Sequence, residues 1–322
     1  MSLTIPQQDN LLKLVEASFK RLYSSLLNSI VTVILTKHRC DALMYLSEEI
    51  IATGFYIDKN TVVSVYHTLK AMPSEIMNIC VATPIGEIHK ARILGIDDDN
   101  DAVFLDVDIE GSPLPLLDSL VEEGSFVLSV GFAEGVLRPF ITYGLVSGLE
   151  VKSNVYEKQL EGLILLNMPI APGMSGAPII NLDGRSVGMI ISRAISSQSL
   201  SLALPSTRIL LDHHMIKKMG RIIRIKLGIR LLQSPTVLRR LGLKNGLIVA
   251  DVLNKELLKM CNINVGDVIV KVNDVEVLTL EDFRRIITKN IISGNNVIEL
   301  TIFGGLKEKK CYIDISKLQM EV

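Results

Sequence analysis

A short loop rich in glycine and proline is the stretch of this sequence best suited to chemistry. Residues 172–178 read PGMSGAP and lead into a predicted β-hairpin, IINLDGRSVGMI. Glycine adopts backbone angles that other residues rarely adopt, so the amide N–H groups of such a loop can converge beside the hydroxyl of Ser175. Ser175 is therefore a candidate nucleophile. The same composition also fits an ordinary hairpin connection with an incidental serine.

A serine nucleophile needs a general base, and that base needs a carboxylate that fixes its tautomer. His67 ends the apolar run at residues 61–66, where a rigid strand can aim an imidazole. Asp101 directly precedes the apolar run AVFLDV, so its side chain can turn inward. The alternative without a catalytic role is that His67 is a structural histidine and that Asp101 belongs to a solvated turn. The other histidines, which fit solvent-facing or helical positions better, are His38, His89, His213 and His214.

The order of these three residues along the chain differs between the known folds that carry a serine, histidine and aspartate triad. Histidine, aspartate and then serine is the order of the chymotrypsin-type double barrel, whereas α/β-hydrolases and subtilisins use other orders. About ten short β-rich runs, many bounded by turn residues, lie between residues 30 and 203 and predict an antiparallel sandwich or a pair of barrels. An esterase on another fold is therefore disfavoured.

Other elements are predicted around this β-rich region. Apolar residues recur at helical spacing over residues 9–28, which predicts an amphipathic helix. A second helix is expected over residues 206–219, and the charged stretch at residues 217–226 is the best candidate for a linker. The β-rich unit that follows contains one clear helix, which Thr279 can cap.

Composition excludes several classes of function. The chain has 322 residues, enough for about two domains, with 34 basic and 35 acidic residues and a formal net charge of -1. This balance argues against a protein that binds nucleic acid. No apolar run reaches the ~18 residues that a membrane-spanning helix needs. The N-terminal residues do not resemble a secretory signal.

The four cysteines form no CxxC pair, which excludes the common zinc and thioredoxin-like sites. We expect reduced, buried thiols in a cytoplasmic protein, and no metal or organic cofactor. An alternative is one disulfide in each half of the chain. The residues concerned are Cys40, Cys80, Cys261 and Cys311.

Three stretches together resemble the HtrA (DegP-like) family of serine proteases. They are ATGFYIDKNTVVSVYHTL, DDDNDAVFLDVD and APGMSGAPIINLDGRSVGMI, and they continue into LALPS, KLGI, LKNGLIVADV and INVGDVIVKVNDVEVLTLEDFRRII. The resemblance covers roughly residues 29–316. It implies a mainly β fold: a chymotrypsin-like double β-barrel over residues 29–220, followed by a small α+β PDZ domain over residues 221–322. The helix within residues 1–28 precedes them.

The resemblance also implies the role of each site residue. Ser175 is the nucleophile, His67 the general base and acid, and Asp101 the orienting carboxylate. The oxyanion hole is formed by the N–H groups of Gly173 and Ser175, with Met174 between them. The sequence departs from the family pattern at Tyr66, Met174, Ala177 and Ile191.

Partners follow from the same resemblance. We expect an ATP-independent endopeptidase that acts on unfolded or damaged proteins and assembles as a trimer, with residues 9–28 either at the trimer contact or packed on their own barrel. The alternative is a PDZ-guided holdase whose protease domain is weak or silent. Substrate backbone is expected to pair with Ile190, Ile191, Ser192 and Arg193, with small or medium aliphatic residues before the cleaved bond. Peptide C-termini are expected to bind at Lys226, Leu227, Gly228 and Ile229.

Overall fold

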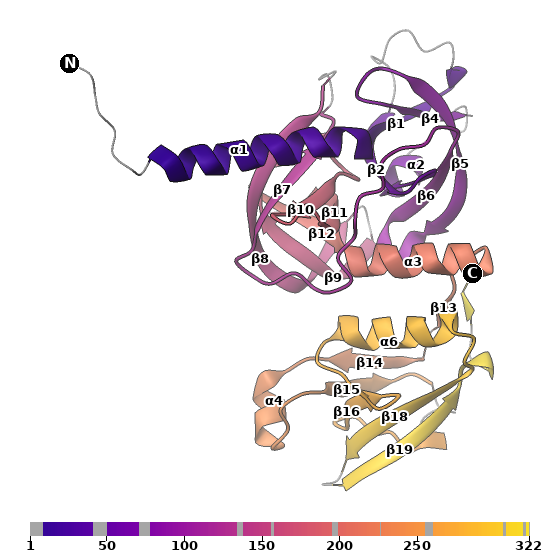
Figure 1. Cartoon of the computed structure of the whole chain (residues 1–322). Helices are drawn as coiled ribbons and strands as arrows, with labels where there is room; N and C mark the ends of the chain where they lie inside the picture. Colours follow the sequence, from indigo (N-terminus) through magenta and orange to yellow (C-terminus); the bar gives the residue numbers. More distant parts are fainter. Residues whose placement is uncertain are drawn as a thin grey trace. The chain divides into compact units, whose positions relative to one another are not determined.

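A computed structural model describes most of the chain, and its residues divide into two compact units, 1–209 and 210–322 (Figure 1). The domain limits expected at residues 28 and 220 stay predictions, since the units divide within helix α3 (Ser206–Met219). The described residues are 9–40, 50–70, 78–133, 138–155, 158–194, 199–225, 227–254, 260–304, 307–317 and 320–321.

The first unit begins with a closed antiparallel barrel whose strand order is β1-β2-β3-β6-β5-β4. Strands β1 and β3 are buried along their whole length, which explains why their sequences, IVTVILT and TVVSV, are almost continuously apolar. The strands are β1 (Ile30–Thr36), β2 (Ile50–Asp58), β3 (Thr61–Val65), β4 (Asn78–Ala82), β5 (Ile88–Asp97) and β6 (Ala102–Val107). Two short helical turns, α2 (His67–Lys70) and η3 (Asp98–Asn100), lie at the ends of β3 and β5.

A second closed barrel follows in the order β10-β11-β12-β9-β8-β7. Its core includes Val127, Leu166, Ile179 and Ile190, all fully buried. The strands are β7 (Phe126–Gly131), β8 (Phe140–Val155), β9 (Lys158–Asn167), β10 (Pro178–Asn181), β11 (Ser186–Arg193) and β12 (Leu200–Pro205). The double β-barrel predicted from the sequence is confirmed.

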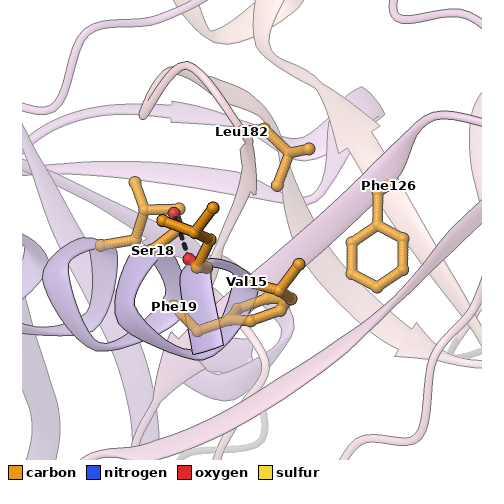
Figure 2. A pocket seen from close by; sticks show the side chains of 7 residues that line it. Val15, Ser18, Phe19, Phe126 and Leu182 are labelled. Atoms are coloured by element: carbon orange, nitrogen blue, oxygen red, sulfur yellow. Dashed lines mark hydrogen bonds between the residues drawn. The ribbon is translucent and has the colours of Figure 1, made fainter. Parts of the chain in front are cut away.

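Helix α1 (Asp9–Leu26), which the short turn η1 (Leu27–Ser29) joins to β1, confirms the predicted N-terminal helix. Phe19 packs against Phe126 and Tyr143 of the second barrel, with ring centroids 5.9 Å apart in both pairs. The Tyr23 hydroxyl donates to the Pro139 carbonyl at 3.2 Å. The helix thus packs on its own barrel. A cavity of about 400 Å³ remains between helix and barrel (Figure 2), and it is lined by Leu14, Val15, Ser18, Phe19, Leu22, Phe126 and Leu182.

The second unit is a small α+β domain, as expected of a PDZ domain. Its main sheet has the order β14-β15-β16-β18-β19, with β17 paired to β16, and β13 pairs separately with β20. Thr279 caps α6 (Leu280–Ile292) through a capping box with Asp282, as the sequence suggested. The remaining elements are β13 (Arg224–Ile225), β14 (Ile229–Leu232), α4 (Pro235–Arg240), β15 (Leu247–Val252), β16 (Val268–Val272), β17 (Val275–Glu276), β18 (Val297–Gly304), β19 (Lys307–Asp314), η4 (Ile315–Lys317) and β20 (Met320–Glu321).

The expectation of four reduced thiols is wrong. Cys40 is joined to Cys80, and Cys261 to Cys311, so each unit carries one disulfide. The sequence left this pairing open because cysteines 40 and 50 positions apart give no local signal of their proximity. The pairing of β1 with β4 sets Ile34 opposite Cys80, which brings Cys80 close to the chain that leaves β1 and reaches Cys40.

No helix among the described residues is long and apolar enough to cross a membrane. Within the same part of the chain, histidine, cysteine and acidic side chains form no group of three or more that could hold a metal ion.

Candidate active site

His67 and Asp101 meet because strands β3 and β6 are paired. Val65 lies opposite Ala102, so the residues just beyond that end of the ladder are neighbours. Asp101 Oδ1 accepts a hydrogen bond from the His67 backbone N–H at 2.7 Å, and Asp101 Oδ2 lies 2.6 Å from His67 Nδ1. The two side chains are only 12% and 11% exposed. This carboxylate therefore fixes the position of the imidazole, and it is Nδ1 of the ring that faces Asp101.

The backbone of Asp101 is itself held in an uncommon conformation. Its φ is +56°, in the left-handed region that non-glycine residues rarely adopt. It ends the turn η3, and its N–H donates to the Asp98 carbonyl at 3.4 Å, while its own carbonyl accepts from Tyr66 N–H at 3.1 Å. Conformations of this kind persist where surrounding contacts over-determine them. Both backbone groups and both carboxylate oxygens of Asp101 are engaged.

The loop around Ser175 consists of two consecutive tight turns. Met174 N–H donates to the Ala171 carbonyl at 3.1 Å, and Ala177 N–H donates to the Met174 carbonyl at 2.9 Å. Gly173 and Gly176, each third in its turn, have φ of +91° and +89°. This is the type II geometry, which requires a positive φ at that position. It sets Ser175 at the second position of the second turn.

Backbone hydrogen bonds tie this loop to the second barrel. Gly176 N–H donates to the Ile190 carbonyl, and Ile190 N–H donates to the Ala177 carbonyl, both at 2.8 Å. The side chain of Met174 is fully buried in the core of the same barrel. An apolar residue fits that position because its surroundings are entirely hydrophobic.

Thr53, on β2, ties the same loop to the first barrel. Its N–H donates to the Ser175 carbonyl at 2.8 Å, and its hydroxyl donates to the Gly173 carbonyl at 2.9 Å. The hydroxyl also accepts from the Phe132 N–H of the second barrel at 2.9 Å. Thr53 is fully buried. Its role could not be recognised from the sequence, because a threonine in a predicted strand is ordinary.

The pairing of β2 with β3 brings the serine loop to the histidine. Phe55 lies opposite Val63, and the Ser64 hydroxyl donates to the Thr53 carbonyl at 2.7 Å. Thr53, which holds Ser175, therefore sits beside the end of the strand that leads into His67. A Cβ on Gly176 would lie 1.9 Å from the Thr53 carbonyl oxygen, so only glycine permits this approach.

The backbone N–H groups of Gly173 and Ser175 are those expected from the resemblance to bind an oxyanion. Among the described residues, no hydrogen bond engages the N–H of Gly173 or of Ser175. The N–H of Met174, between them, is used within the first turn. Paired backbone donors of this kind can stabilise negative charge on a carbonyl oxygen.

The strand expected to pair with substrate needs one correction. Both backbone groups of Ile190 already bond to the serine loop, so Ile190 is not free to pair with substrate. Strand β11 pairs with β12 as far as Arg193, but pairs with β10 only as far as Met189. The edge left for an extended peptide is therefore residues 191–193. The Ser192 hydroxyl donates to the Arg193 carbonyl at 3.1 Å.

The proposed peptide-binding loop of the second unit leads into an edge strand. Gly228 has a φ of +68°, and its carbonyl accepts from Leu253 N–H at 2.8 Å and from Asn254 N–H at 3.2 Å. Ile229 then begins β14, the first strand of the sheet, and Leu227 is buried. Lys226, which the sequence also assigned to this loop, lies outside the described residues.

Comparison with known proteins agrees with this geometry. Residues 52–189 match the family model described as a trypsin-like peptidase domain. A Rickettsia conorii protein named "Probable periplasmic serine endoprotease DegP-like" is 26% identical over 285 residues, which cover 84% of this chain and 54% of that protein. The Rickettsia prowazekii protein of the same name is 27% identical with the same coverage. The chain spans about half the length of these curated relatives.

Solved structures of the same kind share the fold. The HtrA-type protease AlgW, solved with a tripeptide, superposes with a TM-score of 0.68 at 20% identity, covering 94% of this chain and 97% of that one. A serine endoprotease from Yersinia pestis gives a TM-score of 0.58 at 18% identity, with 92% and 96% covered. The resemblance inferred from the sequence is confirmed: the chain is similar to HtrA/DegP-like proteases and has the trypsin fold.

Replacing Thr53 tests how the two barrels are joined. Thr53→Val removes the hydroxyl but keeps the shape, leaving the buried Phe132 N–H and Gly173 carbonyl without that partner. We expect the free energy of unfolding to fall by about 1–3 kcal/mol, and the Phe132 amide to exchange with deuterium faster. Thr53→Ser keeps the hydroxyl and is the matched control. Unchanged exchange at Phe132 in Thr53→Val would show that the link does not hold the loop.

Proposed function

We propose that the first unit of this chain, which resembles HtrA/DegP-like proteases and matches a trypsin-like peptidase domain, is a serine endopeptidase. The main support for this proposal is the His67–Asp101 pair, which lies beside the strand that holds the backbone of Ser175. The substrate class proposed from the resemblance is unfolded or damaged protein, hydrolysed without ATP.

The proposed reaction uses only side chains and amides of this unit. Ser175 Oγ attacks the substrate carbonyl while His67 Nε2 takes its proton, and Asp101 stabilises the imidazolium through Nδ1. The N–H groups of Gly173 and Ser175 receive the negative charge on the carbonyl oxygen, each being worth about 3 kcal/mol in the transition state. His67 then protonates the leaving amine, and a water molecule, activated by the same histidine, releases the acyl group.

Hydrolysis of casein by the wild type, Ser175→Ala and His67→Ala tests this proposal. We expect Ser175→Ala and His67→Ala to lower kcat by at least about 10⁴-fold, because each removes a group that acts in the transition state. Mass spectrometry should find a fluorophosphonate on Ser175 of the wild type only. Lys59→Ala, at an exposed ion pair with Glu110, is the control and should keep full activity.

The alternative is a PDZ-guided holdase with a silent protease domain. It draws support from Met174, whose buried side chain replaces the asparagine that family members usually carry at this position. Equal residual casein with the wild type and Ser175→Ala, together with suppressed aggregation by both, would favour the holdase.

We further propose that the enzyme cleaves after small or medium aliphatic residues. The strand next to the serine loop contributes Ile190 and Ile191, both fully buried, and the core around it is apolar. Met168, Ile170 and Ala171 precede the serine loop and belong to the same cluster. The sequence has no aspartate or glutamate at residues 163–178 or 186–194 to pair with a basic side chain.

Peptides that differ at one residue test the specificity. A peptide with valine before the cleaved bond should give a kcat/KM at least about 10-fold higher than the same peptide with lysine, because an unpaired ammonium is costly to bury. Cleavage of a peptide library mainly after lysine or arginine would contradict this assignment.

The second unit is proposed to recruit or regulate through peptide C-termini. Its edge strand β14 can pair with an extended peptide by β-augmentation, and the residues before it can offer N–H groups to a terminal carboxylate. Phe283 and Ile287 of α6 are buried and suit an aliphatic C-terminal side chain. Peptide ligands are described for the similar protease AlgW, solved with a tripeptide and a decapeptide.

A homo-oligomer, expected from the resemblance to be a trimer, is proposed to form through exposed apolar residues of α1, some of which line the cavity between this helix and its own barrel. Leu12, Leu14 and Val15 are 71%, 59% and 44% exposed. Figure 2 shows Val15 beside the apolar cavity, with Phe126 and Leu182 across from it. Contiguous apolar surface of this kind is typical of interaction sites.

Analytical ultracentrifugation tests the assembly. The wild type should sediment as a trimer at micromolar concentration. Leu14→Glu should shift it to the monomer, because the new carboxylate would be buried at the contact. Lys13→Glu, on the same turn but at an exposed polar position, is the control and should stay trimeric. A monomeric wild type would contradict the proposal.

An oxidising, extracytoplasmic compartment is proposed in place of the cytoplasm expected from the sequence. Two disulfides support this location, since such bonds are rare in the reducing cytosol. Curated relatives named as periplasmic proteins give independent support.

A further inference from the structure

A buried arginine connects the turn that carries Asp101 to the second barrel. Arg208 lies in the first turns of α3 and is only 6% exposed. Its Nη1 donates to Asn100 Oδ1 and to the Glu161 carbonyl, both at 2.8 Å, and its Nη2 donates to the Gly162 carbonyl at 3.3 Å. One guanidinium thus joins the first barrel to strand β9 of the second.

Asn100 is the residue immediately before Asp101, and its position is fixed from both sides. Its backbone N–H donates to Asp97 Oδ1 at 3.2 Å, and its side-chain amide donates to Asp97 Oδ2. Asp97 is nearly fully buried. Because the left-handed backbone of Asp101 follows directly, any movement of Asn100 would rotate the carboxylate that holds His67.

We propose that Arg208 is a positioning residue for the triad carboxylate, acting through Asn100. This inference rests on the proposed function. Arg208 does not reach the reacting atoms. It holds the turn that sets the backbone of Asp101, so that Oδ1 and Oδ2 stay aligned with the two N–H groups of His67.

Arginine suits this role because its planar fork can serve several acceptors at fixed angles, which lysine cannot do. A buried cation also needs acceptors, and two carbonyls and one amide oxygen supply them here. Two further cations, from α2 and β9, contact the exposed side of the turn. Lys70 hydrogen-bonds Asp98, which raises the pKa of Lys70 and lowers that of Asp98, and Lys158 lies 3.2 Å from Asp99.

These groups define the charges around Asp101. They are His67 and Lys70 from α2, Asp97, Asp98 and Asp99 from the turn itself, Lys158 from β9, and Arg208 from α3. The ion pairs that Lys70 and Lys158 make with this turn are exposed, so solvent weakens them. The side chain of Arg208 is buried, so solvent weakens its interactions less.

The test compares Arg208→Lys with Arg92→Lys, a control at an exposed ion pair with Asp106 on the same barrel. In Arg208→Lys we expect kcat to fall on the order of 10-fold, with little change in KM. A displaced Asp101 bonds His67 Nδ1–H less well, so the NMR resonance of that proton should move upfield from its position in the wild type. Arg92→Lys should change neither.

A double-mutant cycle of Arg208→Lys with Asn100→Ala tests whether the loss of activity is transmitted through Asn100. If Arg208 acts through Asn100, the double variant should lose no more activity than the more impaired single variant. Additive losses in the cycle, or a lower Tm for Arg208→Lys with an unchanged kcat and an unshifted His67 Nδ1–H resonance, would overturn the proposal.

The Nδ1–H resonance of His67 is assigned by its loss in His67→Ala. This measurement distinguishes failure of the proposed function from failure of the role proposed for Arg208. A wild type without hydrolytic activity would refute the proposed function, whereas an unshifted Nδ1–H resonance in Arg208→Lys would refute the role of Arg208 alone.

Discussion

The link that Thr53 makes between the two barrels is the constraint on which the site depends. The candidate base and its carboxylate belong to the first barrel, and the candidate nucleophile belongs to a loop of the second. Hydrogen bonds from Thr53 to the carbonyls of Gly173 and Ser175 bring that loop to β2. A small displacement of a catalytic group can cost about 100-fold in rate, so a fully buried link at this junction has direct consequences for chemistry.

The same junction explains the unusual residues around it. Gly176 must be glycine because its backbone approaches the Thr53 carbonyl too closely for a side chain. Asp101 takes a left-handed backbone that four separate hydrogen-bonding groups hold in place. Met174 anchors the serine loop in an apolar core, where a polar side chain would lack partners. Each feature restricts the freedom of a residue that the chemistry needs fixed.

Much of this arrangement could be predicted from the sequence. The order of His67, Asp101 and Ser175 indicated the double barrel, and Thr279 marked the start of α6. These signals are local, or depend only on order along the chain. Contacts between distant residues left no such signal: the partners of Cys40 and Cys261, the role of Thr53, and the approach of Arg208 to Asn100 follow from how the barrels close. The involvement of Ile190 in the serine loop depends on strand register, which composition does not specify.

The most direct test of the account is a crystal structure of the protein after reaction with a fluorophosphonate. We predict a phosphonyl group covalently bound to Ser175 Oγ, with its free oxygen within hydrogen-bond distance of the Gly173 and Ser175 N–H groups and with His67 Nε2 beside the ester oxygen. An unmodified Ser175 with the imidazole directed away from it, or an adduct on another residue, would contradict the account.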